Sequence, residues 1–462
     1  MGKGKTGYGT GGGMMARYSK KLKSDPQLRG LDKAVELVTQ GSYIEGGPAE
    51  GRAGRPGRKN ADYSGWRSIF NPVFCYNGMI LVAGALTVLG IIMVFSSSSV
   101  NLVSAGFSSW RDASRQLLFA VIGLLAGVGL VHFSDAVSNL IRYTSLFILL
   151  GSWVLQALTL TSLGKTVNGN TGWLVIAGTQ FQPAEIMKLA LCLWMPLTVA
   201  SASRRAEGKT TLVQRALAYW PALVTFLISF ILVFAGKDLG TGLIIAVIAL
   251  VALYVGGFPL GLFFGGLIIA GGAVSYFFVL GNENRRKRLL AVYSGCPGGP
   301  SQDGCYQIVH GKYALSSGGL TGLGLGASRE KWNYLPEAKN DFIFAIIGEE
   351  LGYIGAVFVI LLFLILAWCM VNIALRSNDT YSQTVILCVT GWIIFQAFVN
   401  IGVVTSVLPV IGLPLPFISA GGSALIITLM AMGIVIGLSR RQEEIRASLG
   451  RDKKRRKKTK RV

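Results

Sequence analysis

The chain has 462 residues, of which 52% are hydrophobic and only 14% are charged, and it carries a net charge of +22. Apolar runs of about 17 to 25 residues, the length that crosses the core of a bilayer, recur along it. This composition excludes an ordinary soluble globular domain and predicts an all-α polytopic membrane protein. Nucleic-acid binding is not indicated, because much of the excess charge lies in two terminal segments, where Lys and Arg clusters are attracted to anionic membrane lipids.

The first 70 residues are rich in Gly, Lys and Arg, which predicts a disordered basic segment at residues 1–70. Nothing in it resembles a cleavable signal peptide. Gly7, Gly9 and Gly12 have the spacing of a dinucleotide-binding loop, but no strand precedes them and no βαβ pattern follows, so we reject that interpretation. The remainder divides into a membrane domain at residues 71–440 and a basic tail at residues 441–462.

The apolar runs predict about ten membrane-spanning helices. The fourth to sixth runs are short or closely spaced, which leaves the count open by one there. In chain order, the predicted spans are 74–95, 117–133, 143–160, 185–201, 219–236, 241–256, 258–280, 349–371, 383–405 and 420–438.

The basic residues predict the orientation of these spans. Several Lys and Arg side chains lie between residues 204 and 215, and the positive-inside rule places such a short loop in the cytoplasm. An even number of spans then places both termini in the cytoplasm and the large loop at residues 281–341 outside. The basic run Arg285 to Arg288 lies close to a span on the outer side, against that rule, which would suit an anionic substrate.

The cysteines fall into two groups. Cys296 and Cys305 flank a short Pro- and Gly-rich segment of the predicted outer loop, where oxidising conditions favour a disulfide. A metal pair is the less favoured alternative, because no other ligand shows a regular metal spacing. The other cysteines, which we interpret as small apolar side chains within or beside spans, are Cys75, Cys192, Cys369 and Cys388.

Four polar motifs interrupt the apolar sequence, and together they resemble the signatures of the SEDS family. The resemblance runs in order from about residue 74 to residue 439 and is greatest to the cell-division branch FtsW, beside the branches RodA and SpoVE. The paired cysteines resemble a loop variant of actinobacterial members. The motifs are FQPAEIMKLA (181–190), KDLGTG (237–242), YLPEAKNDFIFAIIGEELGYIG (334–355) and GLPLPFISAGGSALI (412–426).

The resemblance implies a peptidoglycan glycosyltransferase that polymerises lipid II on the outer face of the bacterial cell membrane. It also implies a place at the division septum, beside a class B penicillin-binding transpeptidase and other divisome proteins. Such a reaction needs a carboxylate base, because a sugar hydroxyl is a weak nucleophile, and cations that stabilise the leaving diphosphate. A divalent cation such as Mg²⁺ or Mn²⁺ would suit the diphosphate, but no metal-binding motif is present.

Asp303 is the predicted catalytic base. In the family, the essential aspartate lies in the outer loop shortly before a Tyr-Gln pair, which here is 306–307. An ungapped alignment places Pro300 at the aspartate position, and a short gap restores Asp303 to it. The alternative is that Asp303 is a solvated loop acid without a catalytic role.

The remaining polar residues of the four motifs are candidate substrate-binding residues. Charged and polar groups at membrane depth are costly, so they indicate a site, although a structural role for the acids is an equal alternative. Lys188 lies one turn from Glu185, so the two would either pair or present a cation to the diphosphate. The candidates are Glu185, Lys188, Lys237, Asp238, Glu337, Asn340, Asp341, Ser419 and Ser423.

Two further features bear on the site. Glu349 and Glu350 either belong to the site, since carboxylates are costly at membrane depth, or cap the eighth span, since acids favour a helix N-terminus. The glycines and prolines between 412 and 422 interrupt an apolar region, and irregular backbone at this depth is tolerated where it lines a cavity.

Two other functions are compatible with many spans and broken helices. One is a lipid II flippase, since transporters share these features. The other is a noncatalytic divisome scaffold that positions the transpeptidase. We favour the polymerase, because the candidate base lies on the outer side and no inverted repeat is visible in the sequence.

Overall fold

The computed structural model describes residue 63 and residues 65–132, 134–167, 170–176, 179–274 and 305–450. The chain divides into two units, Met1–Ser68 and Ile69–Val462, and the second contains the helical domain. A short 3₁₀ helix, η1 (Gly65–Phe70), precedes the first long helix. Most of the predicted disordered segment and basic tail lies outside the described residues.

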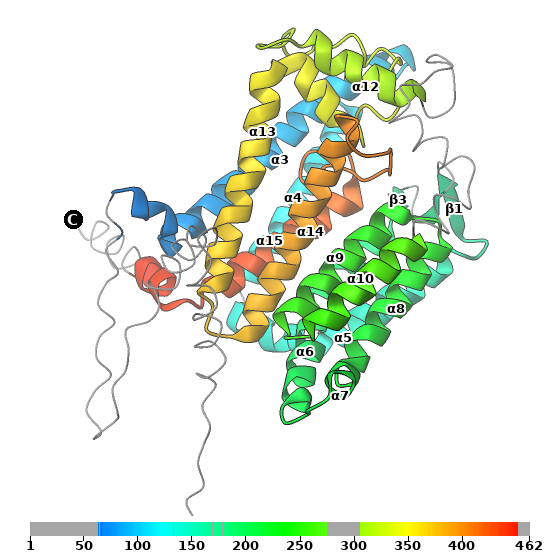
Figure 1. Ribbon diagram of the computed structural model, residues 1–462. Coiled ribbons are helices and arrows are strands. Elements are labelled where there is room, and N and C mark those ends of the chain that lie inside the picture. The colour runs from blue at the N-terminus through cyan, green and yellow to red at the C-terminus, as the bar shows by residue number, and fades with distance from the viewer. Residues whose placement is uncertain are drawn as a thin grey trace, which may run out of the picture. The chain divides into compact units, whose positions relative to one another are not determined.

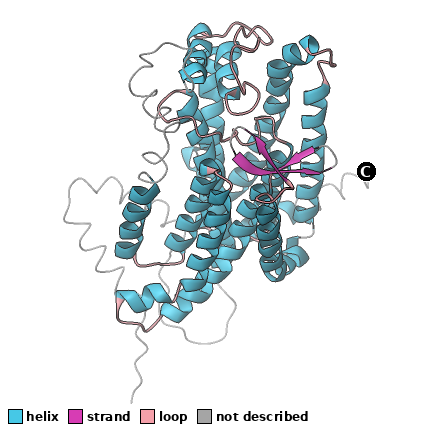
Figure 2. Cartoon of the chain, turned by 90° about the vertical axis from the view of Figure 1, so that its right-hand side faces the viewer, coloured by secondary structure: helices cyan, strands magenta, loops and turns pink. Residues whose placement is uncertain are grey.

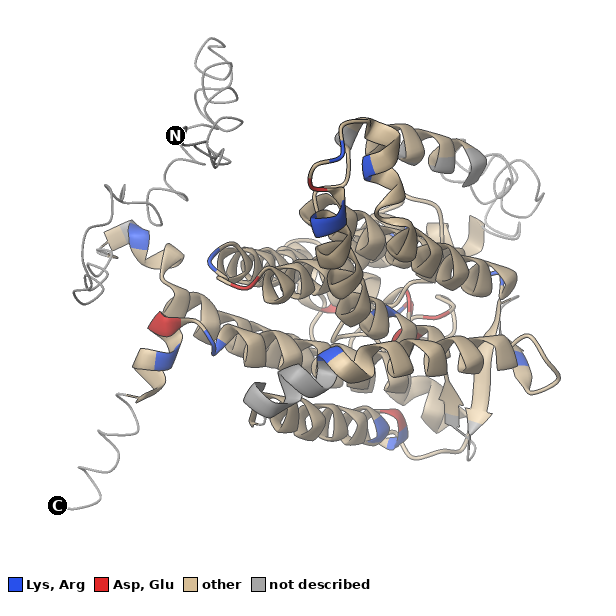
Figure 3. Cartoon of the chain, turned by 90° about the horizontal axis from the view of Figure 1, so that it is seen from below, with Lys and Arg blue, Asp and Glu red and all other residues tan. Residues whose placement is uncertain are grey.

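Within the described residues, a helix occupies each predicted span (Figure 1). Six of them, α3, α4, α6, α13, α14 and α15, are long and apolar enough to cross a membrane, and α8 and α9 are shorter apolar helices. In Figure 3 the middles of the long helices are mostly uncharged, with Lys, Arg, Asp and Glu gathered near their ends. The chain is therefore a multi-pass, mostly helical membrane protein. The helices that match the predicted spans are α3 (Pro72–Ser104), α4 (Arg111–His132), α5 (Ser134–Leu158), α6 (Pro183–Ala206), α8 (Trp220–Ala235), α9 (Leu239–Val255), α10 (Leu260–Val274), α13 (Ile343–Leu375), α14 (Thr380–Val404) and α15 (Gly422–Ser439).

Side-chain caps fix where several of these helices begin. Asn71 accepts a hydrogen bond from the Val73 amide at 2.9 Å, and Pro72 occupies the first turn of α3, where its missing N–H costs nothing. Asp238 caps α9 and Asp379 caps α14 in the same way. Each cap satisfies a backbone donor that a helix terminus otherwise leaves without a partner.

Close contacts join helices from the first and last parts of the domain sequence. Helix α15 packs on α4, α13 packs on α3, and α14 lies against α9, α6 and α13. A Cβ atom at Gly433 of α15 would lie 2.5 Å from the Cα of Gly127 in α4, so only glycine allows this approach. Small residues at such crossings let membrane helices pack backbone to backbone.

The sequence did not predict the small sheet between α5 and α6. Strands β1 (Gly164–Val167), β2 (Asn170–Ile176) and β3 (Thr179–Phe181) form an antiparallel sheet in the order β1-β2-β3 (Figure 2). Leu174 of β2 pairs with Gly164 on one side and with Phe181 on the other. The strand β3 leads directly into α6, so this sheet sets the entry of the helix that carries Glu185 and Lys188.

Two short helices complete the domain. Helix α7 (Leu212–Leu217) lies in the basic loop between α6 and α8, and α12 (Cys305–Ser317) lies within the predicted outer loop. The latter packs mainly on α13, so part of this loop is a folded element.

The predicted start of the eighth span was wrong. Helix α13 begins at Ile343, not at Glu349, so Glu349 and Glu350 lie in its second turn and do not cap it. Their side chains are 0% and 1% exposed. Buried carboxylates need partners, and here the preceding loop folds back and supplies them.

Candidate functional site

The pair Glu185 and Lys188 lies in the buried face of α6. The Nζ of Lys188 is 2.8 Å from Oε2 of Glu185, so of the two alternatives the structure shows mutual pairing. Lys188 also donates to Oε1 of Gln396 at 3.1 Å and lies 4.8 Å from the centre of the Trp392 ring. Because Lys188 is 0% exposed, its charge is compensated entirely by protein groups.

The amides of α14 connect this pair to the irregular segment between α14 and α15. Gln396 donates from Nε2 to the carbonyl of Pro414 at 2.8 Å. Asn400, one turn further along, donates to the carbonyls of Leu413 and Asp341, each at 2.7 Å. These bonds satisfy carbonyls of a backbone that does not form a helix. The segment is thus held against α14 by side chains.

Asp238 joins α6 to α9. One of its carboxylate oxygens accepts from the Thr241 amide at 2.9 Å, and the other accepts from the Thr241 hydroxyl and from Nε2 of Gln182, both at 2.9 Å. The preceding residue, Lys237, has a φ of 62°, in the left-handed region. Asp238 was predicted to bind substrate, and its observed contacts hold the start of α9 against the start of α6.

The segment before α13 lies on the same site. Asn340 donates from Nδ2 to the carboxylate of Glu337, and the carbonyl of Asn340 accepts from the hydroxyl of Ser419 at 2.7 Å. Burial, together with the negative charges of Glu337 and Asp238, raises the pKa of Asp341 to about 7. Asp238 is bonded to Gln182 of the first motif, its charge affects Asp341 in the third, and Ser419 of the fourth is bonded to Asn340. The four motifs, which lie far apart in the sequence, therefore meet around one region.

The candidate residues do not contribute equally. Ser419 also accepts from the Leu415 amide at 2.7 Å, so its hydroxyl shapes the turn before α15. Ser423 lies partly buried in the first turn of α15. Neither serine directly contacts the Glu185–Lys188 pair through a bond seen in the described part of the chain.

A second buried network anchors the loop before α13, and the sequence did not identify it as a unit. The Nζ of Lys331 is 3.0 Å from Oε1 of Glu350, and the hydroxyl of Ser96 on α3 donates to the same carboxylate at 2.6 Å. Glu349 accepts from the hydroxyl of Ser328. The only sequence signal was a set of charged residues at the edge of an apolar run, which does not show which of them pair.

The predicted base Asp303 lies outside the described residues, as do Cys296 and the basic run from 285 to 288. Cys305 begins α12 and is disulfide-bonded. On the same helix, Nδ1 of His310 lies 2.7 Å from Oε2 of Glu330, and the imidazole is 4.2 Å from the Tyr306 ring, centre to centre. The chain from Cys305 onward is therefore held in a packed helix.

In the part of the chain that the structure describes, no group of three or more His, Cys, Asp or Glu side chains is placed to hold a metal ion. The buried carboxylates of Glu185 and Glu350 pair with Lys188 and Lys331, and Glu349 accepts from the Arg329 amide, so these three do not offer the free oxygens that Mg²⁺ or Mn²⁺ requires. We therefore assign no step to a metal.

Comparison with known proteins gives the family. Residues 76–444 match the family described as cell cycle protein, FtsW/RodA/SpoVE. The chain is 36% identical over 427 residues to the probable peptidoglycan glycosyltransferase FtsW of Mycobacterium tuberculosis, covering 90% of this chain and 79% of that protein. It is 34% identical over 363 residues to the stage V sporulation protein E of Bacillus subtilis, covering 78% of this chain and 96% of that protein.

Solved structures agree with this relationship. A structure described as the structural coordination of polymerization and crosslinking by a peptidoglycan synthase complex superimposes with a TM-score of 0.62 and 25% identity, covering 79% of this chain and 97% of that one. The rod shape determining protein RodA of Thermus thermophilus shares the fold, with a TM-score of 0.56 and 24% identity over 79% of this chain and 97% of that chain. The chain belongs to the FtsW/RodA/SpoVE family, the SEDS family of polytopic membrane proteins.

Proposed function

We propose that the protein is a peptidoglycan glycosyltransferase of the cell-division type, which polymerises lipid II into glycan strands. The observation that carries this proposal is the convergence of the four family motifs around Glu185, Lys188, Asp238 and Asp341. A relative that shares 36% identity over 90% of the chain is named as a probable enzyme of this kind. Ionisable residues within membrane helices are functional by default, which agrees with a site here.

The reaction joins an acceptor sugar hydroxyl to the anomeric carbon of a donor sugar. The hydroxyl oxygen forms the new glycosidic bond, the bond from that carbon to the diphosphate breaks, and the hydroxyl proton passes to a base. We assign the base to Asp303, since a positioned carboxylate makes a weak alcohol nucleophile effective. The leaving diphosphate carries the bonding electron pair away, and cationic groups of the outer loop stabilise it.

The buried residues have a different role in this proposal. Lys188 and Glu185 are almost inaccessible, so their role is to hold α6 against α14. Glu337, Asn340 and Asp341 are partly exposed, which makes them the better candidates for direct contact. Lys237 and Asp238 fix the start of α9 beside them.

The cellular arrangement is part of the same proposal. Both termini lie in the cytoplasm, where their basic residues meet anionic lipids, and the loop at residues 281–341 lies outside. The protein works at the septum with a class B penicillin-binding transpeptidase and other divisome proteins. Support for a transpeptidase comes from a structural relative that belongs to a peptidoglycan synthase complex described as coordinating polymerization with crosslinking.

The test is polymerisation of lipid II by the purified full chain, alone and with its transpeptidase, with the products separated by gel electrophoresis. Glycan polymer in either condition supports the proposal. Transfer of lipid II across proteoliposomes without polymer would instead identify a flippase. Neither activity, with intact assembly of the transpeptidase complex, would identify a scaffold.

A further inference from the structure

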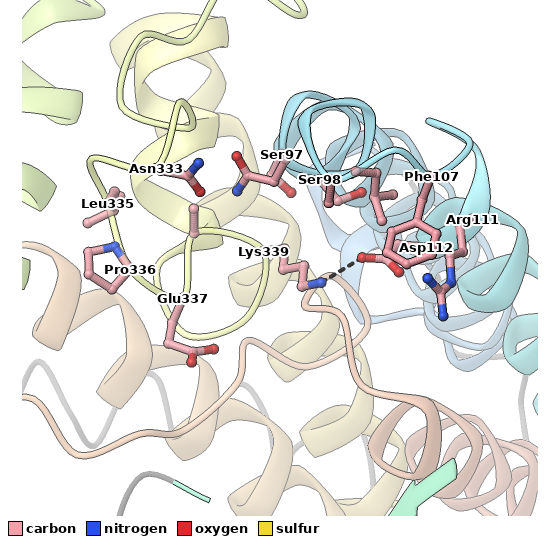
Figure 4. Close-up of a pocket in the computed structure, with 14 residues that line it drawn as sticks. Ser97, Ser98, Phe107, Arg111, Asp112, Asn333, Leu335, Pro336, Glu337 and Lys339 are labelled. Atoms are coloured by element: carbon pink, nitrogen blue, oxygen red, sulfur yellow. Dashed lines mark hydrogen bonds and ion pairs between the residues drawn. The ribbon is translucent and has the colours of Figure 1, made fainter. Parts of the chain in front are cut away.

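A pocket of about 580 Å³ lies near the end of α3, and neither Glu185 nor Lys188 lines it (Figure 4). Its walls come from the end of α3, the start of α4 and the loop that precedes α13. The volume is in the range of about 300 to 1,000 Å³ that is usual for small-molecule sites. Polar residues that line it include Ser97, Asn101, Asp112, Asn333, Glu337 and Lys339.

The charges around this pocket balance. Lys339 lies 2.6 Å from Asp112, and the guanidinium of Arg111 lies 4.2 Å from the centre of the Phe107 ring. With Glu337, the lining contains two cations and two carboxylates among its described residues. Such a lining does not favour a diphosphate, which needs an excess of positive charge. It does offer hydrogen-bond donors and acceptors of both kinds, beside one aromatic ring.

One lining residue has an acceptor that is not used. The side-chain oxygen of Asn101 is buried and has no hydrogen-bond partner among the described residues. A buried polar atom without a partner is costly, and such exceptions call for an explanation. A ligand that carries a hydroxyl or an amide N–H would satisfy this oxygen.

The backbone of the pocket wall is also unusual. Asn333 has a φ of 67° and Glu337 a φ of 57°, both in the left-handed region that non-glycine residues rarely adopt. Strained residues of this kind cluster at ligand sites, where the surroundings hold them in place. Glu337 also accepts from Asn340, so this wall is shared with the candidate active site.

We propose that this pocket is a saccharide-binding subsite that holds an uncharged sugar unit of the growing glycan strand. The inference rests on the proposed glycosyltransferase function and adds a place for the polymer. Amide and carboxylate groups such as Asn101, Asn333 and Asp112 match the donors and acceptors of sugar hydroxyls. Phe107 adds an apolar side chain to the lining, and a neutral ligand meets no net charge there.

The test measures binding of a soluble N-acetylglucosamine tetrasaccharide to the full chain in detergent by isothermal titration calorimetry. Asn101→Leu removes the unpaired acceptor, and Asn333→Gly removes a lining side chain while relieving the left-handed backbone. We expect saturable binding by the unmodified protein and at least tenfold weaker binding by both variants. Asn372→Leu, at the other end of α13, is the matched control and should bind like the unmodified protein.

The binding and polymerisation results test the subsite and the enzyme function separately. The proposed subsite would be contradicted if the unmodified protein showed no saturable binding. It would also be contradicted if Asn101→Leu and Asn333→Gly bound the tetrasaccharide as tightly as the unmodified protein. Binding of inorganic pyrophosphate that is lost in Asn101→Leu would overturn it in favour of an anion site. Lipid II polymerisation is measured on the same preparation of unmodified protein. If the protein makes polymer but does not bind the saccharide, only the proposed subsite is contradicted. If it makes no polymer, the proposed glycosyltransferase function is contradicted.

Discussion

The Nζ of Lys188 lies 2.8 Å from the carboxylate of Glu185, and both side chains are almost fully buried on α6. Gln396 of α14 accepts a hydrogen bond from the same lysine and donates one to the carbonyl of Pro414. The pair thereby connects two helices to the irregular segment before α15. A buried charge that loses its partner is strongly destabilising, so this arrangement can be tested with single and double substitutions.

Glu185→Gln leaves the Lys188 ammonium buried without its carboxylate. We expect it to lower the free energy of unfolding by about 3 to 5 kcal/mol. The double variant Glu185→Gln with Lys188→Met removes both charges and should recover much of that loss. Thermal unfolding in detergent measures the comparison. A double variant no more stable than Glu185→Gln alone would show that the pair does not act as a unit.

Two lysines of the loop that precedes α13 provide a matched test of burial. Lys331 is paired with Glu350 with both side chains at most 1% exposed, whereas the Lys339 side chain, paired with Asp112, is 43% exposed. Lys331→Met should therefore destabilise by several kcal/mol, and Lys339→Met by about 0 to 1 kcal/mol. Chemical denaturation of both variants measures the difference. Equal losses would mean that the buried network does not anchor the loop.

The pKa of Asp341 predicts a pH dependence of stability. Burial and the charges of Glu337 and Asp238 raise this pKa to about 7, whereas an unfolded aspartate titrates near about 3.9. The folded protein binds this proton more tightly, so the contribution of Asp341 to stability falls as the pH rises from about 4 to about 7. Asp341→Asn should remove this fall and unfold at a higher temperature than the unmodified protein above pH 7.

Glu337→Gln is the companion variant for the pH experiment. It removes a charge that raises the pKa of Asp341, so the loss of stability should occur at lower pH than in the unmodified protein. Melting temperatures between pH 4 and pH 8 measure both variants. A melting profile of Asp341→Asn that parallels the unmodified protein would contradict the assignment to Asp341.

Gly352 has a non-helical backbone conformation and marks a kink within α13, where the preceding loop packs closely against it. Its φ is 71°, and a Cβ atom there would lie 2.3 Å from the amide nitrogen of Gly322. Gly352→Ala should destabilise by at least about 1 to 3 kcal/mol, the cost of a strained backbone position. Gly84→Ala on α3, where a Cβ meets nothing within 4 Å, is the control and should be neutral or slightly stabilising. Equal melting temperatures for the two variants would contradict this role.

Much of the helical fold follows from local patterns. Apolar runs predicted the spans, because a helix in lipid must be apolar over a fixed length, and those runs coincide with α3 to α6, α8 to α10 and α13 to α15. The sheet β1 to β3 was missed because its strands are short and lie in a polar connection. The interpretation of Glu349 and Glu350 as caps was wrong, because their partners Lys331, Ser328 and the Arg329 amide come from a loop that folds back.

The candidate site was only partly predictable for a similar reason. The spacing of Glu185 and Lys188 placed both on one helical face, as observed. Nothing local indicated that Lys188 would also bond to Gln396, 208 residues away. The pocket residues Asn101 and Asn333 were not candidates, because each is an ordinary polar residue until the fold brings them to one cavity.

The role of Asp303 is decided by lipid II polymerisation with purified protein, with and without its transpeptidase, comparing unmodified protein with Asp303→Asn. Both proteins should melt at the same temperature, so that a folding defect does not explain the result. We expect polymer from the unmodified protein and none from Asp303→Asn. Equal polymer from both would contradict the assignment of the base, and no polymer from the unmodified protein under either condition would contradict the glycosyltransferase itself.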